Sequence, residues 1–507
     1  MNSVAFPSLR QAGLTLVLGL GETGLAAVRW CLRHGVALRI ADTREAPAGL
    51  EALLDQAAGR PDIRLGSEAL AATVLQGVTR VVLSPGLCPS DEPLAAFLAQ
   101  ARAQGTEIIG EIELFALALA DLAQQGYQPK VLAVTGTNGK TTVTALARRL
   151  AEASGLQAVA AGNISPPALT ALMEALDNDA LPDLWVLELS SFQLESTHSL
   201  RSDAAVVLNL SQDHLDWHGS MQAYAAAKAR LLAGAQVRIV NRDDALVMAM
   251  VEGLQLPEVR SFGRGQPEYE GDLGLEENHG IEWLSVVPLT EAEPMSAAAR
   301  RKLKETPARP TGAAQRLMPV EALRLRGRHN ALNALAALAL VQAVGSGLAP
   351  MLHALREYGG EPHRCEFLRS VAGVDFVNDS KGTNVGATVA ALEGMGRPVV
   401  LIAGGLGKGQ DFSPLAQAVK RHAKAVVLIG QDAPLIRAAL GEVFAAVSEA
   451  ATMEEAVTAA MAQAAEGDVV LLSPACASMD MFQNYMQRGH RFAGAVDELA
   501  MDRGEVA

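Results

Sequence analysis

The chain has 507 residues, a hydrophobic content of 50% and a formal net charge of -14 at pH 7. A chain of this length is too long for one hydrophobic core, so we expect roughly two to four domains. Its net negative charge argues against nucleic acid or an anionic membrane as a partner. The four cysteines lie far apart and form no C-x-x-C pair, which excludes a disulfide or zinc framework and favours a reducing cytoplasm: Cys31, Cys88, Cys365 and Cys476.

The first segment, residues 1–110, opens without the charged start and apolar run of a secretory leader. It continues with LTLVLGLGETGLAAVRWCLRHGVALRIADTR, which predicts a strand, a turn at Gly19, Gly21 and Gly24, a helix, and a strand ending at Asp42. A Gly-x-Gly-x-x-Gly turn with an acid about 20 residues further on is typical of dinucleotide-binding units. Taken alone, this unit predicts NAD, so an NAD-linked oxidoreductase stays open as an alternative.

The second segment, residues 111–360, contains a glycine-rich turn in the sequence VLAVTGTNGKTT. The turn lies between an apolar strand and a helix-compatible run. This order brings backbone N–H groups and a helix N-terminus together, an arrangement that favours binding of a phosphate group. Lys140 adds a positive charge for the phosphates, and Thr141 adds a hydroxyl suited to Mg²⁺. Val134 stands where a strict phosphate loop has glycine, so a plain turn that closes a buried strand remains the alternative.

Polar residues follow further strand candidates of this segment. Glu188 ends the run DLWVLE, where it would either hold Mg²⁺ or simply be solvated. Lys228 lies in a run of Ala and Leu, where a lone lysine is usually a surface residue. The sequence NLSQDHLDWHGS gathers two acids and two histidines in a spacing that matches no zinc signature, so a polar surface loop is the alternative to a metal site: Asp213, His214, Asp216 and His218.

Alternating strand and helix candidates predict a parallel sheet for this segment, with ligands beyond the carboxyl ends of its strands. The stretch 291–316 is rich in charge, Ala and Pro, and it predicts a surface insertion without a strand pattern. The apolar run that starts at Ala334 is too short to span a membrane and fits a buried helix.

The third segment, residues 361–507, has strand candidates that end in Gly, Ser or Asp turns, and it predicts another doubly wound α/β domain. Each charged residue near these turns is most simply a surface charge. Together with the phosphate loop and with Asn330, they predict an ATP site that a second domain closes: Arg364, Asp379, Lys381 and Lys408.

Seven motifs occur in order along the chain: TGTNGKTT, LELSSFQLE, DHLDWH, GRHNALNALAA, PHRCE, NDSKGTN and LLSPACASMDMF. In these motifs the chain resembles the ATP-dependent Mur ligase family over nearly its whole length, and most of all the members that add D-glutamate. The resemblance implies an α/β fold of three domains. These are a Rossmann-like N-terminal domain (1–110), a central P-loop ATPase-like domain with a parallel sheet (111–360) and a Rossmann-like C-terminal domain (361–507).

The resemblance also implies a cytoplasmic reaction of peptidoglycan precursor synthesis. The carboxylate of UDP-N-acetylmuramoyl-L-alanine attacks the γ-phosphate of ATP, and the amine of D-glutamate then attacks the acyl phosphate to give an amide and phosphate. Both steps need the reactants to be positioned and their charge to be neutralised, and neither step needs a protein nucleophile. The cofactors that the resemblance implies are ATP and Mg²⁺. A sibling ligase that adds another amino acid is the main alternative. We expect a monomer that binds no nucleic acid and inserts into no membrane.

Carried over motif by motif, the resemblance assigns roles to the candidate residues. Uridine diphosphate, rather than NAD, would contact Gly21, Glu22, Thr23, Thr43, Arg44, Ser84 and Asn163. ATP would contact Gly136, Thr137, Asn138, Gly139, Lys140, Thr141, Thr142, Asn330 (adenine), Arg364 (phosphates) and Asp379 (ribose). Catalysis would rest on Lys140, Glu188, His214 and Lys228, and Mg²⁺ on Thr141, Glu188, His214 and a carbamate of Lys228. The incoming amino acid would lie among Lys381, Thr383, Lys408, Ser478 and Tyr485.

Overall fold

The computed structural model describes most of the chain. The described residues are 5–10, 13–50, 53, 61–252, 259–289, 309–325, 327–407, 409–441, 444 and 446–505. Lys408 and residues 291–308 of the predicted insertion lie outside these ranges. Within them, no helix combines the length and the apolar character needed to cross a membrane.

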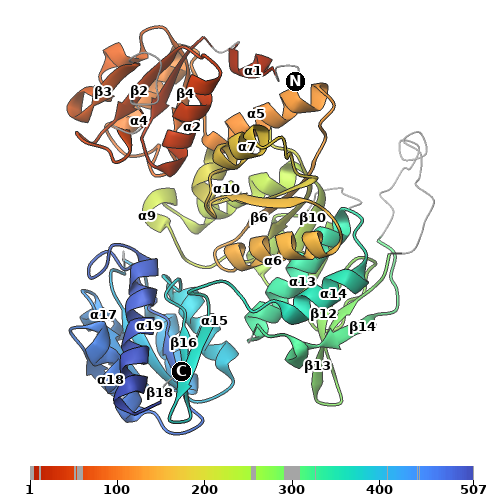
Figure 1. The fold of residues 1–507 in the computed structure, drawn as a ribbon, viewed down its shortest axis with the longest axis vertical. Helices are drawn as coiled ribbons and strands as arrows, with labels where there is room; N and C mark the ends of the chain where they lie inside the picture. Colours follow the sequence, from red (N-terminus) through yellow and green to blue (C-terminus); the bar gives the residue numbers. More distant parts are fainter. Residues whose placement is uncertain are drawn as a thin grey trace.

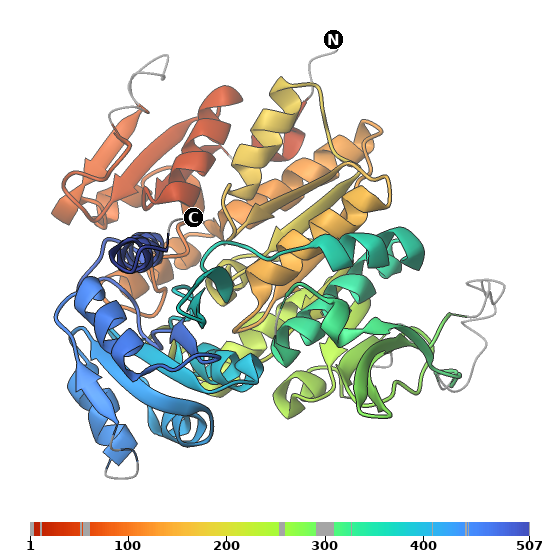
Figure 2. The ribbon, with the colours of Figure 1, turned by 60° about the horizontal axis from the view of Figure 1, so that its bottom comes forward.

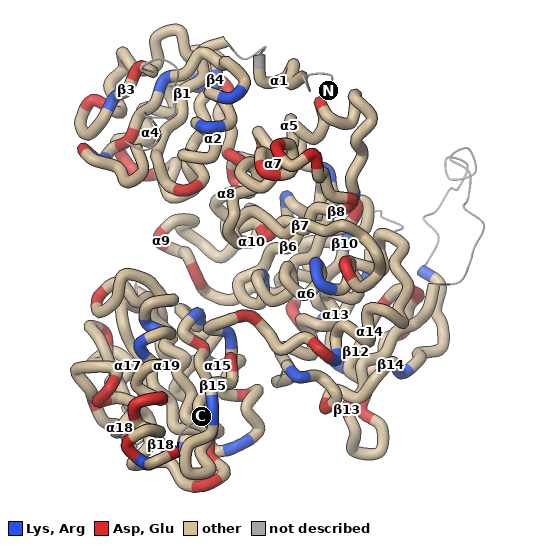
Figure 3. The backbone as a smooth tube through the Cα atoms, in the orientation of Figure 1, with Lys and Arg blue, Asp and Glu red and all other residues tan. Residues whose placement is uncertain are grey.

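The described strands form three sheets that follow one another along the chain. The first and third sheets lie at opposite ends of the central one and on the same side of it (Figures 1 and 2). Lys and Arg are scattered among Asp and Glu over all three parts (Figure 3). The predicted α/β class with three sheet-based units is confirmed.

The first sheet is parallel throughout and has the strand order β3-β2-β1-β4-β5. The order changes direction between β1 and β4, so the turn after β1 lies at a switch point, where ligands bind in such sheets. A Cβ at Gly24 would come 1.9 Å from the carbonyl oxygen of Gly19, so only glycine fits there. The elements up to residue 110 are β1 (Leu14–Leu18), β2 (Leu38–Asp42), β3 (Asp62–Leu65), β4 (Val78–Leu83), β5 (Glu107–Ile109), α1 (Pro7–Arg10), α2 (Glu22–Arg33), α4 (Leu94–Ala103), η1 (Gly66–Glu68) and η2 (Ala72–Leu75). Helix α5 (Glu111–Gln124) follows and leads into the central part.

The second sheet has the order β14-β13-β12-β11-β10-β9-β6-β8-β7. The predicted parallel sheet is confirmed from β6 to β12, whereas β13 and β14 add an antiparallel edge that the sequence analysis missed. The turn between β12 and β13 has positive φ at His279 (51°) and Gly280 (77°), a hairpin signal. The strands are β6 (Lys130–Thr135), β7 (Ala158–Gly162), β8 (Leu184–Glu188), β9 (Ser202–Val207), β10 (Ala235–Asn241), β11 (Val259–Arg264), β12 (Leu273–Asn278), β13 (Ile281–Val286) and β14 (Gln315–Pro319).

The helices of the central part pack on both faces of this sheet. Helix α13 is its most buried helix, and the residues from Ala334 to Val341 have 0% exposure, which confirms the prediction of a buried helix for this run. The described end of the predicted insertion is anchored, because Arg309 forms an ion pair with Asp272. Its last two residues, Gln315 and Arg316, already belong to β14, so the prediction of a segment without a strand is wrong there. The elements are α6 (Lys140–Ala153), α7 (Ala168–Asp177), α8 (Ser191–Glu195), α9 (Leu215–His218), α10 (Met221–Ala233), α11 (Ala245–Ala249), α13 (Arg328–Ala343), α14 (Leu348–Glu357) and η3 (Val320–Ala322).

The third sheet has the order β15-β16-β20-β17-β18-β19, and only its edge strand β15 runs antiparallel to its neighbour. Its four buried apolar strands read as continuous runs, such as VVLIAG, because helices cover both faces. The elements are β15 (Glu366–Val371), β16 (Val374–Asn378), β17 (Val399–Gly404), β18 (Ala423–Ile429), β19 (Val447–Glu449), β20 (Val469–Leu472), α15 (Val385–Met395), α16 (Ser413–His422), α17 (Ala433–Leu440), α18 (Met453–Gln463) and α19 (Tyr485–Asp502).

Candidate active site

The predicted phosphate loop leaves the carboxyl end of β6 and runs into the first turn of α6. Gly136 and Gly139 have positive φ values of 153° and 84°. A Cβ at Gly136 would come 2.9 Å from Leu208 Cβ, and one at Gly139 would come 2.5 Å from Asn333 Oδ1. Both positions therefore require glycine, and the loop turns tightly over a helix N-terminus that favours anions.

Neighbouring segments hold this loop in place. The backbone N–H of Asn138 donates to Asn209 Oδ1 at 2.9 Å, and Asn209 Nδ2 donates back to the carbonyl of Asn138 at 3.1 Å. The hydroxyl groups of Thr137 and Tyr224 lie 3.1 Å apart. Asn209 was not among the predicted site residues, although its place just after β9, at the ligand edge of the sheet, is a usable signal.

Thr141 and Glu188 meet at the open side of the loop. Thr141 Oγ1 donates to Glu188 Oε2 at 2.7 Å, and Asn163 Nδ2 donates to Glu188 Oε1 at 2.7 Å. Arg364, from the third part of the chain, donates to Thr141 Oγ1. Glu188 is only 1% exposed, so the alternative of a solvated strand-end carboxylate is wrong. A hydroxyl and a carboxylate side by side are oxygen ligands of the kind that Mg²⁺ prefers.

Two lysines share the carbonyl of Gly136. Lys140 Nζ donates to it at 2.9 Å, and Lys228 Nζ donates to it at 2.9 Å and to Thr135 Oγ1 at 3.3 Å. Lys228 is 1% exposed, so the expectation of a surface lysine is wrong. Burial lowers the pKa of both amines, and the charge of Lys140 lowers the pKa of Lys228 further. A lowered pKa increases the fraction of each lysine that is present as the neutral, nucleophilic amine.

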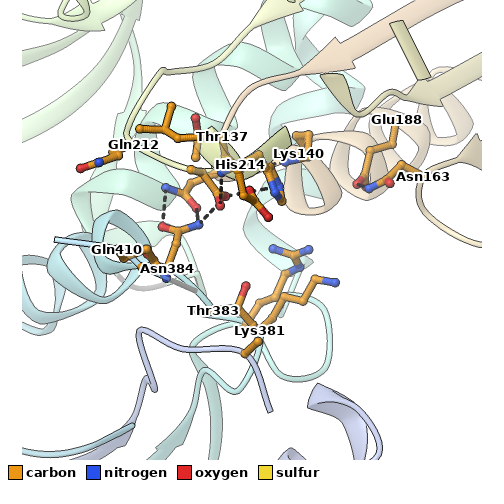
Figure 4. Close-up of a pocket in the computed structure, with 18 residues that line it drawn as sticks. Thr137, Lys140, Asn163, Glu188, Gln212, His214, Lys381, Thr383, Asn384 and Gln410 are labelled. Carbon is orange, nitrogen blue, oxygen red and sulfur yellow. Dashed lines mark hydrogen bonds and ion pairs between the residues drawn. The ribbon is translucent and has the colours of Figure 1, made fainter. Parts of the chain in front are cut away.

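A cavity of about 570 Å³ opens in front of the phosphate loop. Figure 4 shows Lys140 and His214 on one wall, Glu188 and Asn163 to one side, and Lys381 and Thr383 across the cavity. The first four residues belong to the central part and the last two to the C-terminal part. Two parts of the chain thus line one polar cavity, as a site closed by a second domain requires.

A second cavity of about 500 Å³ adjoins the first. It is lined by Asn330 and Asn333 from the buried helix α13 and by Asp379, which directly follows β16. Asn333 Nδ2 donates to Asn330 Oδ1 at 3.2 Å. Burial raises the pKa of Asp379 to about 6, although Ser473 donates a hydrogen bond to it. Asn333 was missed, but its i, i+3 spacing from Asn330 places both on one helix face.

The polar cluster after β9 divides into two groups. His214 lines the phosphate cavity and has a left-handed backbone conformation with φ 54°. His218 instead stacks on Phe192, lies 2.9 Å from Ser191 Oγ, and has its pKa lowered to about 4 by burial. Among the described residues, no group of three or more His, Cys, Asp or Glu is arranged to hold a metal.

Two of the five residues predicted to bind the incoming amino acid, Lys381 and Thr383, line the phosphate cavity. Lys381 Nζ lies 3.8 Å from the ring centroid of Tyr485, and burial lowers the pKa of Lys381 to about 8. Thr383 lines the cavity, and Ser478 is buried, with 4% exposure. Lys408 lies outside the described residues, so its assignment stays a prediction.

The N-terminal glycine turn is closed by a carboxylate. Asp42 Oδ2 accepts a hydrogen bond from the Leu20 N–H at 2.6 Å and forms an ion pair with Arg44 at 2.7 Å. Burial alone would raise the pKa of Asp42, but the hydrogen bonds from Arg44 and Leu20 lower it. An acid held by protein donors is not free to bind a ribose, which counts against the NAD alternative.

The other predicted uridine-diphosphate residues gather around this turn. Gly21 and Glu22 begin α2, with Thr23 next in the same turn, and Thr43 follows Asp42 at the end of β2. Ser84 adjoins the turn, because a Cβ at Gly19 would come 2.7 Å from Ser84 Cβ. Ser165 Oγ, from the central part, donates to Glu22 Oε1. The turn therefore faces the loop that carries Asn163.

Known protein families match all three parts. The matching descriptions are the Mur ligase MurD-like N-terminal domain at residues 14–110, the Mur ligase middle domain at 134–341 and the Mur ligase glutamate ligase domain at 363–476. The chain belongs to the Mur ligase family, as its motifs predicted.

Curated relatives match along nearly the whole chain. The UDP-N-acetylmuramoylalanine--D-glutamate ligase of Bordetella avium is 61% identical over 504 residues, which cover 98% of this chain and 99% of the relative. The relative of the same name from Paraburkholderia phymatum is 53% identical over 498 residues, which cover 98% of each chain.

Solved structures share the fold at low identity. UDP-N-acetylmuramate-alanine ligase MurC from Thermotoga maritima is 18% identical with a TM-score of 0.54, and the match covers 96% of this chain and 99% of that one. Folylpolyglutamate synthase from Mycobacterium tuberculosis complexed with ADP is 16% identical with a TM-score of 0.53, over 81% of this chain and 99% of that one. These likenesses establish the arrangement of the elements and nothing finer.

Proposed function

We propose that this chain is the ATP-dependent ligase that joins D-glutamate to UDP-N-acetylmuramoyl-L-alanine in peptidoglycan precursor synthesis. The observation that carries the proposal is the single cavity in which a phosphate loop, a buried carboxylate and cations from two parts of the chain converge. Relatives at 61% and 53% identity carry the name of this reaction. The domain boundaries that we propose are 1–110, 111–360 and 361–507.

ATP would lie across the two adjoining cavities. Its phosphates would follow the loop 136–142, where Lys140 and Arg364 neutralise their charge. The adenine would lie against Asn330 and the ribose against Asp379, because both residues line the second cavity. The ammonium of Lys140 and the guanidinium of Arg364 come from different domains, so closure of the domains would complete the phosphate site.

Mg²⁺ fits the paired oxygens of Thr141 and Glu188, which are 2.7 Å apart at the open side of the loop. His214, which lines the same cavity as Glu188, would help to hold a second ion. When bound, Mg²⁺ supplies charge neutralisation for the phosphoryl group. Asn163 orients the Glu188 carboxylate from its other oxygen.

The chain's own residues position the reactants. An oxygen of the substrate's L-alanine carboxylate forms a bond to the γ-phosphorus of ATP while the bond to ADP breaks. The amine of D-glutamate then attacks the acyl carbon, loses a proton, and phosphate leaves with the carboxylate oxygen. Lys140 and Arg364 stabilise charge on the phosphoryl group, and the surrounding walls limit access of water.

Lys228 would act as a carbamate. Its amine is buried, its pKa is lowered, and it lies beside the phosphate loop, which are the conditions under which a neutral amine can add CO2. The carbamate would turn an amine into an anionic oxygen ligand for a cation. Activity that stays unchanged after CO2 is removed from enzyme and buffer would end this assignment.

The uridine diphosphate of the substrate would bind at the glycine turn of the first domain. The N-terminus of α2, with Gly21, Glu22 and Thr23, would face it, and Thr43, Arg44 and Ser84 adjoin the same turn. Asn163 would meet the substrate where it passes into the central domain. The muramoyl and alanyl groups would then extend toward the phosphate cavity.

The amine would be chosen by the C-terminal pocket of Lys381, Thr383, Lys408, Ser478 and Tyr485. Cations and hydroxyl groups suit a dicarboxylate such as glutamate. A sibling ligase for another amino acid would share the ATP motifs, and only this pocket would choose the amine. We further propose a cytoplasmic location, since the four cysteines are free, as a reducing compartment would keep them. The proposed enzyme is a monomer.

Phosphate release by the purified protein tests the proposal. With ATP, Mg²⁺ and UDP-N-acetylmuramoyl-L-alanine, we expect release that depends on D-glutamate and not on L-glutamate, L-alanine, L-lysine or diaminopimelate. Release with another amino acid would keep the ATP chemistry and overturn the pocket assignment. No release with any amino acid would overturn the ligase function.

A further inference from the structure

Helix α15 of the C-terminal part begins against the phosphate loop of the central part. Asn384 Nδ2 donates to Asn138 Oδ1 at 3.1 Å and to Asp213 Oδ2 at 3.2 Å. Asn384 Oδ1 caps the same helix by accepting a hydrogen bond from the Ala387 N–H at 2.9 Å. Figure 4 shows the bonds that Asn384 forms with the central part at the edge of the cavity, and Asn384 is only 5% exposed. One buried side chain therefore both starts the helix and binds the other part of the chain.

Two glycines let α15 approach the central part closely. A Cβ at Gly386 would come 2.8 Å from Ser211 Oγ, and a Cβ at Gly394 would come 2.9 Å from His329 Nδ1 and 3.2 Å from the Cα of Gly327. Neither Gly386 nor Gly394 has a positive φ, so space rather than backbone conformation calls for glycine at these positions. They lie two turns apart on the helix, and both contacts are with the central part.

The start of α15 also connects the two halves of the candidate site. Its small residues Ala387, Ala390 and Ala391 line the second cavity, and Asn384 lines the phosphate cavity. The Val385 N–H donates to Gln410 Oε1 at 3.0 Å, and Gln410 follows Lys408 by two residues. A shift of this helix start would therefore move walls of both cavities.

We propose that Asn384 is a positioning residue that latches α15 onto the phosphate loop and so holds the two domains in the arrangement in which they share one ATP cavity. Asn384 acts through Asn138 and Asp213, and it needs no contact with reacting atoms. Its catalytic consequence rests on the proposed ligase function. Its structural consequence, the adjacency of α15 and the phosphate loop, does not.

Asn384→Asp separates the latch from the helix cap. Aspartate is a good N-cap, so α15 keeps its first turn, but the amide donor is lost and a carboxylate faces Asp213. Asn384→Ser also keeps a cap and is too short to reach Asn138. We expect kcat/KM for ATP to fall about 10- to 100-fold in Asn384→Asp and less in Asn384→Ser, as loss of a hydrogen bond to a charged group implies.

Thr452→Ala is the matched control for cap loss. Thr452 Oγ1 caps α18 in the same domain by accepting from the Glu455 N–H at 3.2 Å, on an exposed turn. We expect this variant to lose stability without losing kcat/KM for ATP by more than about twofold. If Asn384→Asp lowered kcat/KM by no more than Thr452→Ala does, the contacts of Asn384 with the central part would have no catalytic consequence, and the proposal would be overturned.

A disulfide tests the adjacency without catalysis. In Ser211→Cys/Gly386→Cys the two Cβ atoms start 3.2 Å apart, and a shift of a few tenths of an ångström gives disulfide spacing. We expect the bond to close under mild oxidation in the ligand-free protein, and to close at least about tenfold more slowly when Asn384→Asp is added. A parent pair that never closes, or equal rates in both proteins, would overturn the latch. Wild-type protein that releases no phosphate would instead overturn the ligase function and leave the disulfide result standing.

Discussion

Two glycine-rich turns of this chain share a backbone plan and differ in charge. The turn at Gly19 to Gly24 follows β1 and starts α2, and the turn at Gly136 to Gly139 follows β6 and starts α6. In the first, the carboxylate of Asp42 accepts the Leu20 N–H at 2.6 Å. In the second, the amines of Lys140 and Lys228 both donate to the carbonyl of Gly136.

The difference teaches that a strand, a glycine turn and a helix N-terminus predict an anion but not which anion. The central turn adds the ammonium group of Lys140 and a hydroxyl beside a carboxylate, which suits a triphosphate with Mg²⁺. The N-terminal turn offers the helix N-terminus and the guanidinium of Arg44, which suits a diphosphate that is held and not transformed. Substitutions at the two turns should therefore have different kinetic signatures.

Lys140→Met should have the largest effect, because it removes the charge that distinguishes the central turn. We expect phosphate release to fall by at least about 10²- to 10³-fold, with binding of the UDP substrate unchanged. Single-turnover phosphate release and calorimetric titration with the UDP substrate measure the two quantities. A fall of less than about tenfold would mean that the turn does not serve phosphoryl transfer.

Glu188→Gln should have the next largest effect. The amide keeps the shape and one oxygen but loses the negative charge that pairs with a cation. We expect kcat to fall about 10²-fold and the Mg²⁺ concentration for half-maximal rate to rise. A magnesium titration of both proteins provides the check. An unchanged magnesium dependence would remove Glu188 from the metal site.

Lys408→Ala should act on one substrate. If the lysine meets a carboxylate of D-glutamate, the KM for D-glutamate should rise about 10- to 100-fold while the KM for ATP stays within about twofold. Initial rates with each substrate varied in turn measure both constants. Equal increases in the two KM values would contradict the assignment of Lys408 to the amino-acid pocket.

Asp42→Asn should have the smallest effect on rate and a clear pH dependence. The Asp42 pKa is lowered in the folded chain, so its contribution to the free energy of unfolding is present above about pH 4 and is lost as the pH falls through the folded value. We expect a stability difference of about 1–2 kcal/mol at pH 7, a modest rise in KM for the UDP substrate, and convergence of the two proteins in acid. Urea unfolding of both proteins at pH 7 and pH 3 measures the stability difference. A difference that is constant with pH would contradict the charge-based closure of the turn.

Local sequence signals predicted what lies within one strand-turn-helix unit. The phosphate loop, Glu188 at the end of β8 and the buried helix α13 were all predicted from local patterns. The antiparallel edge of β13 and β14 was missed because β14 comes at the end of a long stretch rich in charge, Ala and Pro, in which no strand pattern stands out. The burial of Lys228 was missed because a lone lysine among Ala and Leu looks like a surface residue until the fold shows what covers it. Contacts between domains, such as Asn384 with Asn138, join residues far apart in sequence and have no local signal.

The most direct test of the account follows one oxygen atom. UDP-N-acetylmuramoyl-L-alanine with its alanyl carboxylate labelled with oxygen-18 is incubated with the protein, ATP, Mg²⁺ and D-glutamate, and the released phosphate is analysed by mass spectrometry. The account predicts one labelled oxygen in each phosphate, because the carboxylate oxygen leaves with the phosphoryl group. Unlabelled phosphate released together with the amide product would contradict the acyl-phosphate route and the role assigned to the phosphate loop.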